Sequence, residues 1–186
     1  MDAGRFANRV IVVGVTGGIA AYKTVQVVST VRRLGGDVYV VMTPSATHFV
    51  GPLTFQVLSA HPVVSDLWSP DNPWDEPHVF LGERAHLYLI APATAHMLAK
   101  LALGLSDDVV SATALATRAP VLVAPSMSDL MYEHPATQVH LRTLRERGYQ
   151  FVGPEVGRLA SGKEGIGRMA EPETIVEEMA TMLEAR

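Results

Sequence analysis

Short apolar runs rich in valine and isoleucine alternate with helix-like segments along this chain. The runs are RVIVVGV at residues 9–15, DVYVVMT at 37–43, HLYLIAPAT at 86–94, PVLVAPSM at 120–127 and YQFVGPE at 149–155. Apolar runs of this kind are typical of strands buried on both faces, which occur in parallel sheets. The alternation therefore predicts an α/β protein, a single-domain three-layer Rossmann-like or flavodoxin-like fold with a mostly parallel sheet, over residues 1–186.

The segments between the runs carry apolar residues at helical spacing and end in glycine. We expect helices within residues 16–36, 52–60, 95–118 (two pieces joined near Gly104), 134–148 and 171–186. Residues 68–84 are rich in proline and tryptophan and are expected to form a loop. Residues 159–169, LASGKEGIGRM, hold several glycines and are expected to form a mobile lid over a site.

The composition limits the classes of partner. Hydrophobic residues make up 48% of the 186 residues, the formal net charge is −4, and there is no long basic run, which argues against nucleic acid and anionic membranes as partners. The chain has no cysteine, which excludes disulfides and thiolate metal sites, and fits a cytoplasmic protein. His86, His96 and His134 lack metal-ligand spacing, so we expect no metal.

Candidate functional residues follow the predicted strands, where ligands bind in open parallel sheets. GVTGGIA, at residues 14–20, forms the first strand-to-helix turn, and its glycines let the backbone approach a phosphate at the helix N-terminus. The alternative interpretation is tight helix–sheet packing. The segment is not a full G-x-G-x-x-G, and the second strand ends in VMTPSAT, whose hydroxyls can donate to a phosphate. A mononucleotide therefore fits better than a dinucleotide.

Three further segments carry candidate residues, each with a structural alternative. His78 in DEPHVFL is a candidate general base, because imidazole titrates near neutral pH, or else an ordinary surface or core histidine. Thr94 in IAPATAH either contacts a ligand or only caps the next helix. The methionines and serines of APSMSDLMY either contact a flat ligand or fill the core. These residues alone indicate an α/β protein that binds a small anionic ligand.

Six segments in this order resemble the homo-oligomeric flavin-containing cysteine decarboxylases. They are GVTGGIAAYK, VVMTPSATHFV, EPHVFL, IAPATAHMLAKLALGLSDDVVS, APSMSDLMYEHPAT and RLASGKEGIGRMAEP. The resemblance implies FMN held at a subunit interface of a trimer or dodecamer, with no nucleic acid or membrane partner. Its nearest branch decarboxylates 4′-phospho-N-pantothenoylcysteine to 4′-phosphopantetheine in coenzyme A biosynthesis, and bifunctional bacterial members continue into a phosphopantothenate–cysteine ligase domain.

The resemblance also implies roles for individual residues. His78 and Ser161 would be catalytic. The FMN would be bound by Gly17, Gly18, Ile19, Ala20, Thr43, Pro44, Ser45, Thr94, Ala95, His96, Met97 and Ser126. The substrate would be bound by Ser128, Met131, Arg158, Leu159, Ala160 and Arg168, with Lys163 as a competitor for a substrate phosphate.

The chain departs from the family pattern at three positions. Ser128 stands where the family's P-x-M-N has asparagine, and His96 replaces the asparagine of P-A-S-A-N-T. Ser161 stands where the lid commonly reads A-C-G, whose cysteine donates the proton of the reductive step. A hydroxyl is a much weaker acid than a thiol, whose pKa is about 8.5.

These departures keep other functions open. A peptidyl-cysteine decarboxylase of the lantibiotic type stops at an enethiol and needs no thiol acid. A non-catalytic flavin-binding regulatory subunit would tolerate the loss of both the asparagine and the cysteine, although it would not need His78. A flavin prenyltransferase is a weaker fourth alternative, because its phosphate-binding arginine pattern is not evident.

Overall fold

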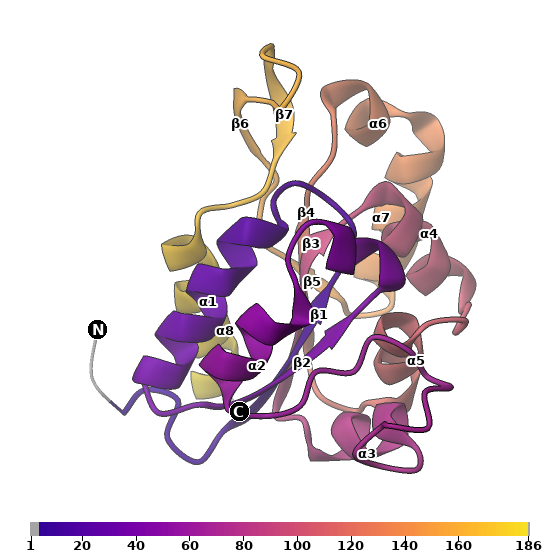
Figure 1. Cartoon of the computed structure of the whole chain (residues 1–186). Helices are drawn as coiled ribbons and strands as arrows, with labels where there is room; N and C mark the ends of the chain where they lie inside the picture. The colour runs from indigo at the N-terminus through magenta and orange to yellow at the C-terminus, as the bar shows by residue number, and fades with distance from the viewer. Residues whose placement is uncertain (1–3, 186) are drawn as a thin grey trace.

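The computed structural model describes residues 4–185 and shows one sheet between two layers of helices, with a small hairpin at one end (Figure 1). The sheet contains β1 (Val10–Val15), β2 (Asp37–Met42), β3 (Leu87–Ala93), β4 (Val121–Pro125) and β5 (Gln150–Phe151), and the hairpin contains β6 (Glu155–Arg158) and β7 (Glu164–Arg168). The helices are α1 (Ala21–Arg33), α2 (Pro52–Ser59), α3 (Pro77–Arg84), α4 (Ala95–Leu103), α5 (Val109–Ala116), α6 (Asp129–Glu133), α7 (Pro135–Glu146) and α8 (Pro172–Glu184), with a 3-10 helix η1 (Pro44–His48).

The strand order of the main sheet is β2-β1-β3-β4-β5, and every neighbouring pair is parallel. This is the flavodoxin-like order, so the predicted fold class is confirmed. Every residue of β3 is buried, as expected for a central strand with helices on both faces. The carboxyl ends of the parallel strands meet at one edge of the sheet.

The core has one part on each face of the sheet, because side chains along a strand alternate. Ile11 and Val13 pack with α1, α2 and α8, whereas Val12 packs with α3, α4, α5 and α7. The α3–α5 contact depends on Gly82, where a Cβ would lie 2.9 Å from the carbonyl oxygen of Ala116. None of the helices within residues 4–185 is long and apolar enough to cross a bilayer.

Four segments differ from the sequence-based expectation. The short helices η1 and α6 were not expected. Residues 68–84 are not entirely loop, because α3 begins at Pro77 and buries Leu81; its eight residues and internal glycine gave little helical pattern. Residues 159–169 are the turn and second strand of an antiparallel hairpin, with Gly162 at φ +85° in the turn. Glycine-rich strands have weak strand signals, because glycine lacks a side chain to pack.

Candidate functional site

A pocket of about 620 Å³ lies at the carboxyl edge of the sheet, between the first strand-to-helix turn and the hairpin. Its residues come from five places in the chain: the start of α1, the end of β3, the loop after β4, α6 and the hairpin. The parallel strands bring the first three together, and the hairpin supplies the remaining wall. This is where ligands bind in open α/β sheets.

The two glycines of the first turn have different roles. A Cβ on Gly17 would lie 2.5 Å from the Cβ of Ser45, so this residue must be glycine for the turn to pack against η1. A Cβ on Gly18 would meet only Thr94 Cγ2 at 3.7 Å and Pro92 Cγ at 3.9 Å, which is ordinary contact. Tight packing therefore explains Gly17, while Gly18 leaves open space in the pocket at the N-terminus of α1.

Thr94 both caps a helix and lines the pocket. Its Oγ1 accepts a hydrogen bond from the Met97 amide at 3.2 Å, and its own amide donates to Thr16 Oγ1 at 3.2 Å. Thr16 Oγ1 in turn donates to the carbonyl of Pro92 at 2.6 Å. These bonds tie the ends of β1 and β3 together, so the pocket floor is held by buried hydroxyl groups.

The base of the hairpin is fixed to the loop after β4. The Met127 amide donates to the carbonyl of Gly167 at 3.0 Å. Gly167 has φ +140°, and a Cβ there would lie 2.2 Å from the carbonyl oxygen of Met127, so only glycine fits. This contact sets the distance between the hairpin and Ser128.

A charged cluster joins α1 to the end of the hairpin. Lys23 Nζ donates to the carbonyl of Met169 at 3.3 Å and to Glu171 Oε2 at 3.1 Å, and Arg168 pairs with the same carboxylate. Burial, followed by the nearby Arg168 guanidinium, lowers the pKa of Lys23 from its usual value. The pocket therefore has two cations at one end that share one carboxylate.

The structure brings most of the predicted site residues together. Those that line the pocket are Gly17, Gly18, Ile19, Ala20, Thr94, Ala95, Ser126, Ser128, Met131, Arg158, Leu159, Ala160, Ser161 and Arg168. Thr43, Pro44, Ser45, His96 and Met97 do not line it. The Thr43 hydroxyl accepts the Ala46 amide at the start of η1, and Met97 is 1% exposed in the core.

His78 lies in the first turn of α3, outside the pocket of its own chain. Its Nδ1 is buried and has no hydrogen-bond partner among the described residues. An unpaired buried polar atom is uncommon and calls for an explanation.

Four residues line the pocket without having been singled out: Tyr22, Lys23, Gly167 and Met169. Met127, which was expected either to contact a flat ligand or to fill the core, lines it too. All five lie within the quoted motifs, but VVMTPSATHFV and EPHVFL contribute no residue to the lining. Lys23 lies in the first turn of α1, directly after the predicted Gly17–Ala20 segment. This closeness in the chain was the available signal for it.

The alanine substitution Gly167→Ala should destabilise the protein by about 1–3 kcal/mol, because the new methyl group meets the Met127 carbonyl and the backbone has positive φ. Thermal unfolding followed by circular dichroism measures the effect. Gly162→Ala is the matched control, since φ is +85° there but a Cβ meets nothing within 4 Å. Equal melting temperatures for the two variants would show that the Met127 contact is unimportant.

Comparison with known proteins agrees with this arrangement. The sequence profile of the family described as Flavoprotein matches residues 4–184. The coenzyme A biosynthesis bifunctional protein CoaBC of Bacillus subtilis (strain 168) is 45% identical over 169 residues, which are 91% of this chain and 42% of that protein. This chain thus spans about two fifths of the length of the curated relatives it matches.

Two of the solved structures that resemble nearly the whole chain are decarboxylases. One is a PPC decarboxylase mutant complexed with pantothenoylaminoethenethiol, with a TM-score of 0.86 and 32% identity over 95% of this chain and 98% of that one. The other is the FMN-dependent cysteine decarboxylase SpaF, with a TM-score of 0.82 and 31% identity over 97% and 98%. Because the profile and these similarities cover nearly all of the sequence, the chain belongs to the flavoprotein family, as its six ordered motifs predicted.

Proposed function

We propose that this chain is a cytoplasmic FMN-dependent carboxy-lyase that converts 4′-phospho-N-pantothenoylcysteine to 4′-phosphopantetheine in coenzyme A biosynthesis. The observation that carries the proposal is the pocket between Gly18 and the hairpin, which combines an open helix N-terminus, apolar walls and cationic side chains. The similarity to CoaBC proteins supports the choice of substrate. Residues 1–186 are proposed to form one flavoprotein domain.

The residues of the pocket fit FMN. Gly18 leaves space beside the N-terminus of the thirteen-residue helix α1, where a phosphate is favoured by the helix dipole and amide groups. Ile19 is 60% exposed and Met131 is 49% exposed, so both offer apolar surface to a flat ring. Bound FMN supplies a two-electron acceptor and donor. The residues predicted for FMN that do not line this pocket, such as Thr43 and Met97, would act by holding its walls.

The substrate would lie between α6 and the hairpin. Lys23, Arg158 and Arg168 are the cations of the pocket and would hold the substrate carboxylate and phosphate. The Ser128 hydroxyl caps α6 by accepting the Met131 amide at 3.4 Å, and it can still donate its own proton to a carboxylate. Ser161, at the tip of the hairpin, would relay a proton from water to the product carbon. The hairpin would thereby exclude water from the reacting atoms while carrying one of the proton-transfer groups.

A second candidate is a decarboxylase that stops at the enethiol, as in the lantibiotic-type reaction. The observation that favours it is a hydroxyl rather than a thiol at position 161 of the pocket. A PPC decarboxylase mutant with serine in place of a cysteine is the one complexed with pantothenoylaminoethenethiol. The enethiol is two electrons more oxidised than the thiol product, so this reaction needs an external acceptor such as dioxygen. A regulatory flavin-binding subunit would form neither product.

We further propose that the chain works as a homo-oligomer, a trimer or dodecamer, in which a second copy brings His78 to the pocket. Residues 34–83 contain no lysine or arginine but six acidic residues, and they form the β2 edge of the sheet with exposed Leu53, Val57 and Trp68. The opposite edge carries the arginines of α7 and exposed Leu130 and Val139. The acidic face and the arginine-bearing face are different and have opposite charge. Contact between such faces of neighbouring copies favours a head-to-tail ring of subunits. A ligase, fused or separate, is the expected functional partner.

The direct test is incubation of the FMN-loaded protein with 4′-phosphopantothenoylcysteine and, separately, with a peptide that ends in cysteine. Mass spectrometry then distinguishes loss of CO₂ alone from loss of CO₂ and two hydrogens. We expect turnover of the small molecule to 4′-phosphopantetheine. Turnover of the peptide alone would replace the proposed substrate, and turnover of neither would favour the regulatory role.

Replacement of Gly18 by valine should weaken FMN binding at least about ten-fold while the fold is retained, because the side chain fills the open space beside α1. Flavin absorbance per protein after dialysis measures the loss. Gly51→Ala is the control, since a Cβ there meets nothing within 4 Å and lies outside the pocket. A wild-type protein that remains colourless after FMN is added would refute the proposed cofactor.

A further inference from the structure

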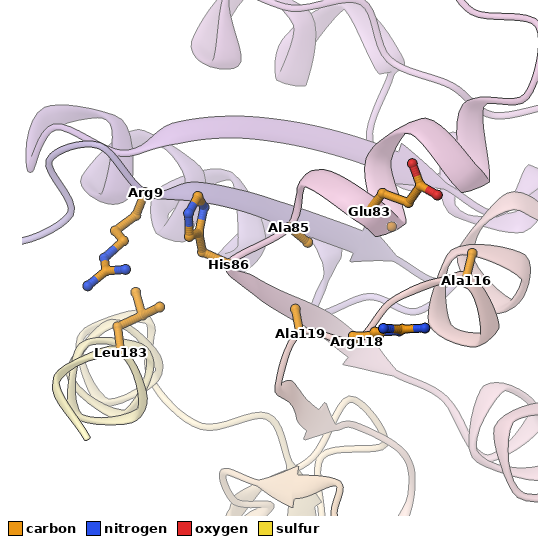
Figure 2. A pocket seen from close by; sticks show the side chains of 9 residues that line it. Arg9, Glu83, Ala85, His86, Ala116, Arg118, Ala119 and Leu183 are labelled. Atoms are coloured by element: carbon orange, nitrogen blue, oxygen red, sulfur yellow. The ribbon is translucent and has the colours of Figure 1, made fainter. Parts of the chain in front are cut away.

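A second depression, of about 750 Å³, lies at the amino-terminal edge of the sheet, at the opposite end from the pocket described above. It is bordered by the residues just before β1, β3 and β4 and by the last turns of α3, α5 and α8 (Figure 2). The residues that have been given roles in the proposed decarboxylation do not line it. The depression therefore needs an explanation of its own.

The orientation of His86 makes it a hydrogen-bond donor toward this depression. The backbone amide of Val10 donates to His86 Nδ1 at 3.0 Å, so in the neutral imidazole the proton is on Nε2. Figure 2 shows Arg9 and His86 at the same end of the depression, with the Arg9 side chain extending from the ring toward Leu183. This end therefore carries both an imidazole N–H group and a guanidinium, and such groups bind carboxylate or phosphate oxygens.

The charge balance of the lining is positive. Arg9 and Arg118 take part in none of the ion pairs found within residues 4–185. Within the same residues, Glu83 is the one acidic side chain that lines the depression. The C-terminal ends of α3, α5 and α8 carry partial negative charge, which disfavours an anion. This effect is reduced at α3, because Thr117 Oγ1 donates a hydrogen bond to the carbonyl of Gly82 at 2.7 Å.

The lining between the cations is apolar. Ala85 and Ala119 lie between Arg9 and Arg118, and Leu183 lies at the Arg9 end (Figure 2). β1 and β4 are separated by β3, so the residues that precede them lie roughly 10 Å apart across the sheet. A ligand of that length would place an acidic group at Arg9 and His86 and a body on the alanines, with its far end near Arg118.

We propose that this depression binds a small organic anion, a phosphate monoester or a carboxylate with an apolar body. Arg9 and His86 hold the anionic group, and Arg118 contacts the distal end. The site is separate from the FMN pocket and does not depend on the proposed decarboxylation.

Isothermal titration of the FMN-saturated protein with phenyl phosphate, benzoate and benzyl alcohol tests the proposal. Saturation with FMN blocks phosphate binding at the other site. We expect at least one of the two anions to bind with a Kd of about 1 mM or below and the uncharged alcohol not to bind. Arg9→Gln should weaken that binding about ten-fold and Arg118→Gln less, whereas Arg33→Gln, at an exposed position in the last turn of α1, should leave it unchanged.

The anion that binds more tightly identifies the acidic group of the natural ligand as phosphate or carboxylate. Absence of binding by both anions at about 10 mM, or equal affinity in the wild type and the Arg9→Gln variant, would overturn the proposal. Chemical shifts of the His86 ring give a second readout, since a bound anion must perturb them. In a folded Arg9→Gln variant, weaker binding should leave the His86 shifts unchanged when the anion is added. In the wild type, His86 shifts that do not change on addition of the anion would overturn the proposal.

Discussion

The His78→Asn variant should lose decarboxylation by at least about 10²-fold while its FMN absorbance stays at the wild-type level. The physical reason is that asparagine cannot exchange a proton near neutral pH, whereas His78 lies outside the lining of the flavin pocket of its own chain. Steady-state rates and flavin absorbance of the same preparation measure both quantities. His134→Asn, at an exposed position outside the pocket where asparagine can keep the cap of α7, is the matched control and should keep its activity.

Mixed oligomers then show whether His78 acts in a neighbouring copy. His78→Asn supplies an intact pocket without the imidazole, and Gly18→Val supplies the imidazole without a working pocket. Without added FMN, Gly18→Val stays largely unloaded. Each variant alone should then have little activity, and their co-expression should restore part of it. Full activity of His78→Asn alone would remove this residue from the catalytic site. If the mixture regains no activity, His78 acts on substrate bound in the pocket of its own chain.

The Ser161→Cys variant should convert a larger share of the substrate to 4′-phosphopantetheine instead of the enethiol. The step that reduces and protonates the enethiol should be faster by about 10²-fold. A thiol with a pKa of about 8.5 donates a proton far more readily than a serine hydroxyl, and general acids typically contribute 10²–10⁴-fold. Mass spectrometry of single-turnover reactions without dioxygen measures the ratio of the two products.

Ser106→Cys, on an exposed loop, is the control for thiol chemistry in solution and should leave the ratio unchanged. An unchanged ratio in Ser161→Cys would show that the proton comes from another group, such as water or Lys23. If the wild type forms only the enethiol and the cysteine variant also forms the thiol product, the chain is an enethiol-forming enzyme whose course is set by this one residue.

Much of the fold was predictable because it depends on local patterns. The apolar runs identified all five strands of the sheet. The signal is strongest for β1, β3 and β4, since a strand buried on both faces must be apolar throughout. α3, the short helices η1 and α6, and the hairpin were missed. α3 is short, begins at Pro77 and includes Gly82, so its helical pattern is weak. The hairpin strands are rich in glycine, and the hairpin is held in place by a contact between Gly167 and Met127 that no local pattern records.

The candidate site shows the same division. The sequence by itself identified the segments that form the pocket, but it also included VVMTPSATHFV and EPHVFL, which do not line it. Three of the pocket segments follow parallel strands, whose carboxyl ends meet at one edge of the sheet. Only the tertiary structure decided which residues within them line it. Thr43 and Met97 turn toward a 3-10 helix and the core, Lys23 and Gly167 enter the pocket, and His78 remains outside it. Side-chain direction and contacts between distant segments decide these positions, and neither is fixed by the order of residues within one motif.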